Sequence, residues 1–309
     1  MEFGNQTFVT EFILLGFSGS RKIQMIYFVM FLVIYILTII ANGTIISLVI
    51  IDSCLHSPMY FFLGNFAFLE IWYSTTTVPK MLSNFLAESK AISYRNCIAQ
   101  LCSIFTFGLT EFLLLAVMAY DRYIAICYPL RYGAIMNSNF CKQVVIASWA
   151  SGFLTGWTLT IPIVQLSFCR LNQINHFFCD FVPLLKLSCS DTTATEASFF
   201  TAAYVVVLSS LFFTTVSYCY IILTILRIPS NSGRQKAFST CSSHLTVAVI
   251  FYGTVIFTYL RPNSTHDLDT DKVVSLFYSV ITPLLNPLIY SLRNQKVIKS
   301  LKTAWRKIC

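Results

Sequence analysis

A charged triplet and a cysteine mark the two ends of a long apolar stretch of this chain. Asp121, Arg122 and Tyr123 close the stretch, and Cys97 stands near its start. The 25 residues from Cys97 to Arg122 would span roughly 37 Å as a helix, at ~1.5 Å per residue. That length crosses a hydrocarbon core of about 30 Å. The spacing therefore predicts a disulfide-forming cysteine at one membrane face and an acid–base pair at the other.

Two carboxylates, Glu70 and Glu111, lie within apolar stretches and form the second candidate for chemistry. A carboxylate inside a membrane costs a few kcal/mol or more, so it marks a functional site by default. Glu111 stands three helical turns before Arg122, on the same helical face. Two oxygen ligands suit a hard cation. The alternative is that one or both glutamates are protonated and hydrogen-bond only Asn42, Asn286 or a water molecule.

The composition places the chain in a membrane. Of its 309 residues 56% are hydrophobic and only 11% are charged, with a mean hydropathy of +0.70. Soluble domains carry about 25% charged residues. No convergent catalytic set is visible, which argues against an enzyme. A transporter would show two repeated halves with broken segments, and the chain has none.

Seven apolar segments are long enough to cross a membrane as helices. We therefore expect an all-α membrane protein, one seven-transmembrane domain over residues 1–309, with an N-terminal segment at 1–24, a helix bundle at 25–292 and a tail at 293–309. The segments are Met25–Ile51, Pro58–Phe85, Asn96–Cys127, Phe140–Leu166, Ala197–Ile228, Lys236–Leu260 and Lys272–Leu292.

Charge gives the expected orientation. Most of the excess Lys and Arg falls on the side that holds the C-terminus, and such loops face the cytoplasm. The net charge of +8 thus reflects membrane topology and anionic lipid, so no nucleic-acid partner is needed. The N-terminus is then outside, where Asn5 in Asn5-Gln6-Thr7 is a glycosylation acceptor. We expect the first helix to act as the signal anchor at the plasma membrane.

The tail has the pattern of a short amphipathic helix on the inner leaflet. Lys296, Lys299, Lys302 and Arg306 occupy its polar face. The alternative is a frayed basic tail. The apolar face would hold Val297, Ile298, Leu301, Ala304, Trp305 and Ile308.

Four strings carry a resemblance to a known family. They are Met118–Tyr132, His56–Leu63, Lys236–Leu245 and Pro283–Asn294. Together they resemble the olfactory receptors of the tetrapod-type class II, a branch of the rhodopsin-like G-protein-coupled receptors. The resemblance implies an odorant ligand and a stimulatory olfactory G protein that raises cyclic AMP. The alternatives are a non-olfactory small-molecule receptor of the same fold or, further off, a transporter.

The resemblance also assigns roles to single residues. It implies a sodium ion at Glu70 and Glu111 and no other cofactor, although Glu70 stands where the family usually has Asp, which alters the cage. Arg122 would exchange ion-pair and hydrogen-bond partners on activation. The implied coupling and switch residues are Asp121, Arg122, Tyr123, Tyr218, His244 and Tyr290.

Four cysteines are expected on the outside, where disulfides persist. Cys97, Cys169, Cys179 and Cys189 allow three pairings, and some could stay free. The resemblance implies Cys97–Cys179, which leaves Cys169–Cys189. The remaining seven cysteines should be reduced packing residues.

Helix depth predicts which side chains line the outer half of the bundle, and the resemblance implies that the odorant pocket lies there. The set is mostly apolar, with Tyr252, Tyr259 and Ser279 as hydrogen-bonding groups, which suits a small uncharged volatile molecule. The alternative is that many of these residues only pack helix on helix. The predicted lining is Ile104, Phe105, Gly108, Leu109, Ala202, Ala203, Val206, Phe251, Tyr252, Val255, Tyr259, Leu276 and Ser279.

Overall fold

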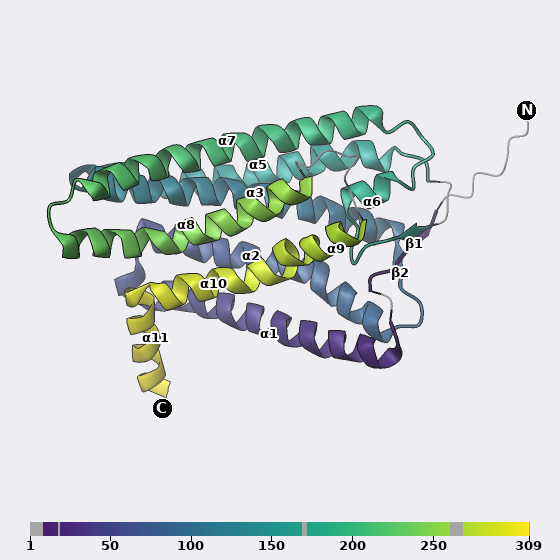
Figure 1. The fold of residues 1–309 in the computed structure, drawn as a ribbon, viewed down its shortest axis with the longest axis horizontal. Helices are drawn as coiled ribbons and strands as arrows, with labels where there is room; N and C mark the ends of the chain where they lie inside the picture. Colours follow the sequence, from purple (N-terminus) through teal and green to yellow (C-terminus); the bar gives the residue numbers. More distant parts are fainter. Residues whose placement is uncertain (1–8, 18, 169–171, 260–267, 309) are drawn as a thin grey trace, which may run out of the picture.

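The computed structural model describes residues 9–17, 19–168, 172–259 and 268–308. Its long helices lie side by side in one bundle (Figure 1). All seven predicted segments are helical, and the largest shift is at the start of α8, five residues earlier than expected. The long helices are α1 (Arg21–Ile51), α2 (Pro58–Leu86), α3 (Tyr94–Cys127), α5 (Ser138–Val164), α7 (Thr193–Leu226) and α8 (Asn231–Tyr259).

The last segment of the bundle is not one regular helix. It consists of α9 (Leu268–Leu276), the π-helical turn η4 (Phe277–Ile281) and α10 (Thr282–Arg293). Short elements join the long helices: the 3-10 turns η1 (Ser53–Leu55) and η2 (Pro129–Arg131), and the helices α4 (Tyr132–Ile135) and α6 (Phe181–Leu185).

Hydropathy along the described helices fits a multi-pass membrane protein. Five helical stretches are long and apolar enough to cross a membrane, namely α1, α3, α5, α7 and Lys272–Tyr290. In α8 the apolar part is the shorter stretch Cys241–Phe257. The helix α2 is in neither group, and it carries polar residues such as Glu70 and Thr77, which are buried inside the bundle.

One end of the bundle, called here the sheet end, carries a small sheet that the sequence did not predict. Strand β1 (Glu11–Leu14) lies between β2 (Ala91–Ser93), antiparallel to it, and β3 (Gln173–Ile174), parallel to it. Phe12 and Leu14 are fully buried. Alternate side chains of a strand face the same side, so β1 seals the helices beneath it.

Helices α3 and α5 approach closely because α5 has glycines at the contact. A Cβ on Gly152 would collide with the side-chain oxygen of Thr110, and one on Gly156 with that of Thr106. Small residues four apart let membrane helices pack backbone to backbone. This contact fixes the rotation of α3 and so the direction in which its polar residues point.

The opposite end, called the tail end, carries helix α11 (Gln295–Ile308), which turns away from α10 across the bundle (Figure 1). The predicted helical tail is therefore present. Val297 is buried, whereas Lys296, Lys299 and Lys302 are exposed. The hydroxyl of Ser300 donates to the Asp52 carboxylate at 2.5 Å, which joins α11 to the α1–α2 turn. The side chains of Ala304, Trp305, Arg306 and Ile308 lie outside the described residues.

Candidate ligand cavity and polar switch residues

A cavity of about 110 Å³ lies in the half of the bundle nearer the sheet end. Its walls come from α2, α3, α5, α7, α8 and η4, and nearly all of them are hydrocarbon. The lining residues are Tyr73, Ile104, Phe105, Gly108, Leu109, Glu111, Phe112, Thr155, Leu159, Phe199, Ala202, Ala203, Val206, Val207, Phe251, Val255 and Tyr278.

Most of the predicted lining residues meet at this cavity, but the polar ones do not. The hydroxyl of Tyr252 pairs with Thr214 of α7 at 3.2 Å. That of Ser279 donates to the Ser275 carbonyl at 2.6 Å. Leu276 is buried away from the lining, and the side chain of Tyr259 lies outside the described residues. The predicted residues at the cavity are Ile104, Phe105, Gly108, Leu109, Ala202, Ala203, Val206, Phe251 and Val255.

Sequence reasoning missed the contribution of α5 and the carboxylate end of the cavity. Thr155 and Leu159, four residues apart on α5, face the cavity, as do Tyr73 of α2 and Tyr278 of η4. Glu111, predicted only as an ion ligand, is also a lining residue. The sequence signal that could have indicated this lining was the four-residue spacing of Thr155 and Leu159 on either side of Gly156.

Gly108 leaves space within the lining. A Cβ added there would meet no atom within 4 Å, leaving out the helix's own nearby backbone. The preceding turn of the same face carries Ile104, only 4% exposed. The absence of a side chain at Gly108 therefore leaves open space beside the cavity at this position.

The segment over the cavity is held by the predicted disulfide Cys97–Cys179, which is confirmed with a Cα–Cα distance of 5.4 Å. The backbone N–H of Cys179 also donates to the Gln100 side chain at 2.9 Å. Cys189 is disulfide-bonded. Cys169, like Asn5, lies outside the described residues, so the Cys169–Cys189 pairing stays a prediction.

A buried histidine stands in the same segment. His176 is 2% exposed, and its Nδ1 accepts the backbone N–H of Phe178 at 3.4 Å. Burial lowers the pKa of the His176 imidazole to about 3, since desolvation disfavours the charged form. The ring is therefore neutral in the folded protein at physiological pH.

The two intramembrane glutamates are buried inside the bundle, Glu70 on α2 and Glu111 on α3. The Asn286 amide donates to Glu70 Oε1, whereas Asn42 bonds the carbonyls of Thr38 and Pro283 at 3.0 Å each. Among the described residues, Glu70 Oε2 and Asn286 Oδ1 have no hydrogen-bond partner. Such oxygens fit a hard cation, which prefers oxygen ligands.

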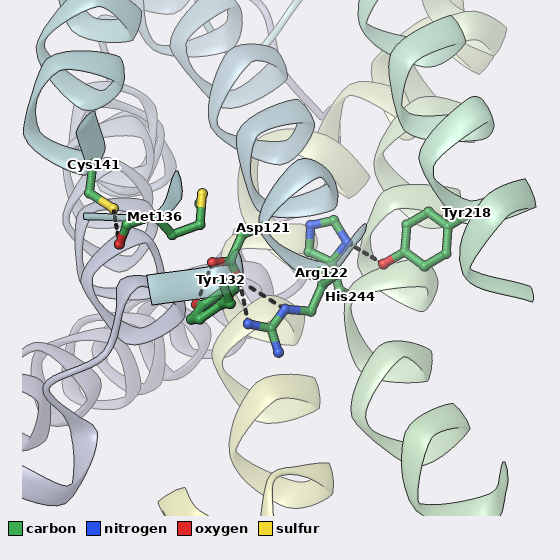
Figure 2. A network of polar contacts seen from close by, with 7 residues as sticks. All are labelled: Asp121, Arg122, Tyr132, Met136, Cys141, Tyr218 and His244. Atoms are coloured by element: carbon green, nitrogen blue, oxygen red, sulfur yellow. Dashed lines mark hydrogen bonds and ion pairs between the residues drawn. The ribbon is translucent and has the colours of Figure 1, made fainter. Parts of the chain in front are cut away.

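Near the tail end, Arg122 is held by its own neighbour. Arg122 Nε donates to Asp121 Oδ2 at 3.0 Å, and a second guanidinium nitrogen contacts the same oxygen (Figure 2). Asp121 is 1% exposed and Arg122 8%. Tyr132 of α4, which the sequence did not single out, donates to Asp121 Oδ1 at 2.8 Å. Burial and the nearby Asp121 carboxylate raise the pKa of the Tyr132 hydroxyl, so it stays a donor.

Two other predicted switch residues, Tyr218 and His244, form a separate hydrogen-bonded pair beside Arg122. The Tyr218 hydroxyl lies 2.5 Å from His244 Nδ1 (Figure 2). His244 Nε2 and the Tyr290 hydroxyl are buried and have no partner among the described residues. Tyr123 instead points its hydroxyl at Tyr128, 3.5 Å away. Among the described residues, Arg122–Asp121 and Tyr218–His244 are thus two separate pairs, with the Tyr290 hydroxyl joined to neither.

Comparison with known proteins agrees with this arrangement. Residues 31–307 match the family model described as olfactory receptor. The chain is 51% identical to the human protein named olfactory receptor 6F1, over 99% of each chain. It is 49% identical to the mouse olfactory receptor 5P80, over 98% of this chain and 97% of that one. With matches of this length and identity, the chain belongs to the olfactory receptor family.

Proposed function

We propose that this protein is an odorant-activated receptor that couples to a stimulatory olfactory-type G protein and raises cyclic AMP. The family is one of G-protein-coupled receptors and not of enzymes. The observation that carries the proposal is an apolar cavity at one end of the bundle and the buried Arg122–Asp121 pair at the other.

The orientation follows from the same features. The disulfide-bonded sheet end faces outside, where disulfides persist, and the Lys-rich tail faces the cytoplasm. The protein then resides in the plasma membrane with Asn5 available for glycosylation.

The cavity suits a small, mostly apolar ligand. A ligand of about ten heavy atoms gaining roughly 0.6 kcal/mol per atom binds with ~6 kcal/mol, a dissociation constant of tens of micromolar. Binding biases a pre-existing equilibrium toward a state in which Arg122 leaves Asp121. Tyr218 and Tyr290, beside Arg122, are its partners in that state, where an opened tail end admits the G protein.

The experiment is a cyclic-AMP assay with a panel of neutral odorants in cells that also report surface receptor by staining. At least one odorant should raise cyclic AMP in a saturable way, and Arg122→Ala should abolish the response at equal surface level. Full signalling by Arg122→Ala would contradict the proposed switch. Silence toward the whole panel, together with a response to charged ligands, would favour a non-olfactory receptor of this fold.

A sodium ion between Glu70 and Glu111 is the second part of the proposal. It is supported by the two unpartnered oxygens, Glu70 Oε2 and Asn286 Oδ1. A bound cation would stabilise the state whose carboxylates it neutralises. Sodium chloride should then raise the melting temperature of purified receptor more than choline chloride does, and Glu70→Gln should remove the difference. Equal effects of both salts on the native protein would exclude the site.

A further inference from the structure

The cavity is not equally closed on all sides. Its residues on α8 and η4, and Ile104 and Val207 on α3 and α7, are each less than a tenth exposed. A second group of residues lines the same cavity but is half-buried. Because both groups contact the cavity, that contact alone does not explain why the second group is more exposed. This half-buried group, called the rim, lies on α3, α5 and α7 and consists of Phe105, Gly108, Leu109, Thr155, Leu159, Ala202, Ala203 and Val206.

The rim contains small side chains where α5 and α7 face each other. These two helices run side by side (Figure 1). Thr155 comes from α5, Ala202 and Ala203 come from α7, and Gly108 comes from α3. The half-buried part of the lining therefore includes the small residues on the α5–α7 side of the cavity.

This side of the cavity lies within the apolar part of the helices and not in a loop. The neighbouring side chains are apolar and exposed: Leu154 (69%) and Trp157 (64%) on α5, and Val205 (63%) on α7. Thr155 stands nine residues before the end of α5 at Val164, or roughly 13 Å at ~1.5 Å per residue. Apolar side chains at that depth contact lipid chains.

Above the rim, packed aromatic rings separate the cavity from the sheet end. Phe181 of α6 stacks on Phe199 of α7 with ring centroids 3.7 Å apart, and Phe105 lies 5.3 Å from Phe199. Phe181 is 1% exposed and Phe199 6%. The neighbouring Cys97–Cys179 disulfide fixes this roof. In the described part of the chain, the way over α3 and α7 is therefore closed to water.

We propose that the cavity opens laterally into the outer leaflet between α5 and α7, and that its ligands reach it from the bilayer as uncharged, lipid-soluble molecules. That such ligands are odorants rests on the function proposed above. Charged molecules do not dissolve in the hydrocarbon at the rim. Each methylene added to a ligand enriches it in the membrane about four-fold, so the concentration seen by the rim exceeds that in water.

The test uses a lipid that cannot reach the cavity through water. Purified receptor is placed in nanodiscs containing a phosphatidylcholine with a photoreactive diazirine in its acyl chain. After irradiation, labelled residues are mapped by mass spectrometry. We expect label on the lipid-facing Leu154 and Val205, and also on the cavity side of α3, at Phe105, Gly108 or Leu109. Phe251 and Val255, at the closed side, should be labelled several-fold less.

Two variants narrow the opening, so the test does not depend on one of them folding. Ala203→Phe and Ala202→Phe should each cut the α3 label several-fold and leave the Leu154 label unchanged. Absence of α3 label in the native protein, with Leu154 labelled, would overturn the lateral opening. Unchanged α3 label in both variants would place the route elsewhere. No odorant response is measured, so a failure of the proposed odorant function would leave this result intact.

Discussion

At the scale of single residues, Gly108 gives the sharpest test of the cavity. Gly108→Leu adds four carbons where a Cβ meets open space, so the variant should fold and reach the surface. The leucine would occupy volume that the ligand needs, and ~1.4 kcal/mol of lost binding is a ten-fold loss of potency. We expect at least that shift in odorant dose–response curves, with surface staining on the same cells. Unchanged potency for every agonist would show that the ligand binds elsewhere.

Tyr132 links the α3–α5 connection to Asp121 of α3, because its hydroxyl donates a hydrogen bond to the Asp121 carboxylate. Hydrogen bonds to charged groups contribute about 1.5–3 kcal/mol. Tyr132→Phe removes this bond, which we expect to stabilise the resting state and not the active one. The population of the active state should therefore rise about ten-fold or more. Basal cyclic AMP, normalised to surface receptor, measures this.

The matched control for Tyr132 is Tyr35→Phe. The Tyr35 hydroxyl pairs with Thr75 at 3.0 Å, between α1 and α2, and is not bonded to Asp121. Equal basal activity in Tyr132→Phe and native receptor would show that the bond to Asp121 does not favour the resting state.

At the scale of elements, the α3–α5 contact should depend on Gly156. Gly156→Ala places a Cβ against Thr106 and within 3.1 Å of the Cys102 carbonyl. Backbone cannot move aside cheaply, and overpacking costs about 1–3 kcal/mol. We expect a lower melting temperature in detergent. Gly43→Ala on α1, whose Cβ meets nothing within 4 Å, is the control, and an equal change in both variants would refute the packing role.

The sequence predicted the elements that membrane burial determines. Apolar length fixed the seven helices, and the spacing of Val297 and Leu301 predicted α11. It did not predict β1, because a four-residue strand has too short an alternation of Phe12 and Leu14 to distinguish from a polar tail. The predicted polar residues of the lining were also placed wrongly, because Tyr252 and Ser279 form hydrogen bonds elsewhere inside the bundle. Which way such side chains point depends on the rotation of each helix about its axis. That rotation is determined by helix contacts such as the one at Gly152.

At the scale of the whole molecule, stability should depend on pH through His176. Its pKa is about 3 when folded and 6.5 when unfolded, so the unfolded chain binds the extra proton between these values. Stability is therefore complete above about pH 6.5 and falls on acidification toward pH 3. Between about pH 7.5 and pH 5 the loss should be ~2 kcal/mol. The check is the difference in melting temperature at the two pH values, compared with His176→Gln, which should show a smaller difference. An identical pH dependence would assign it to other groups.

The position of β1 has a consequence for biosynthesis. It is the middle strand of its sheet, yet its partners β2 and β3 begin at Ala91 and Gln173. A ribosome adding about 5–20 residues per second needs roughly ten to thirty seconds to pass from β1 to β3. In the proposed orientation the N-terminal segment is translocated during that interval, while β1 still lacks at least one of its two partner strands. Oligosaccharide transfer to Asn5 can take place in this window, before the strand is covered on both edges and the roof closes.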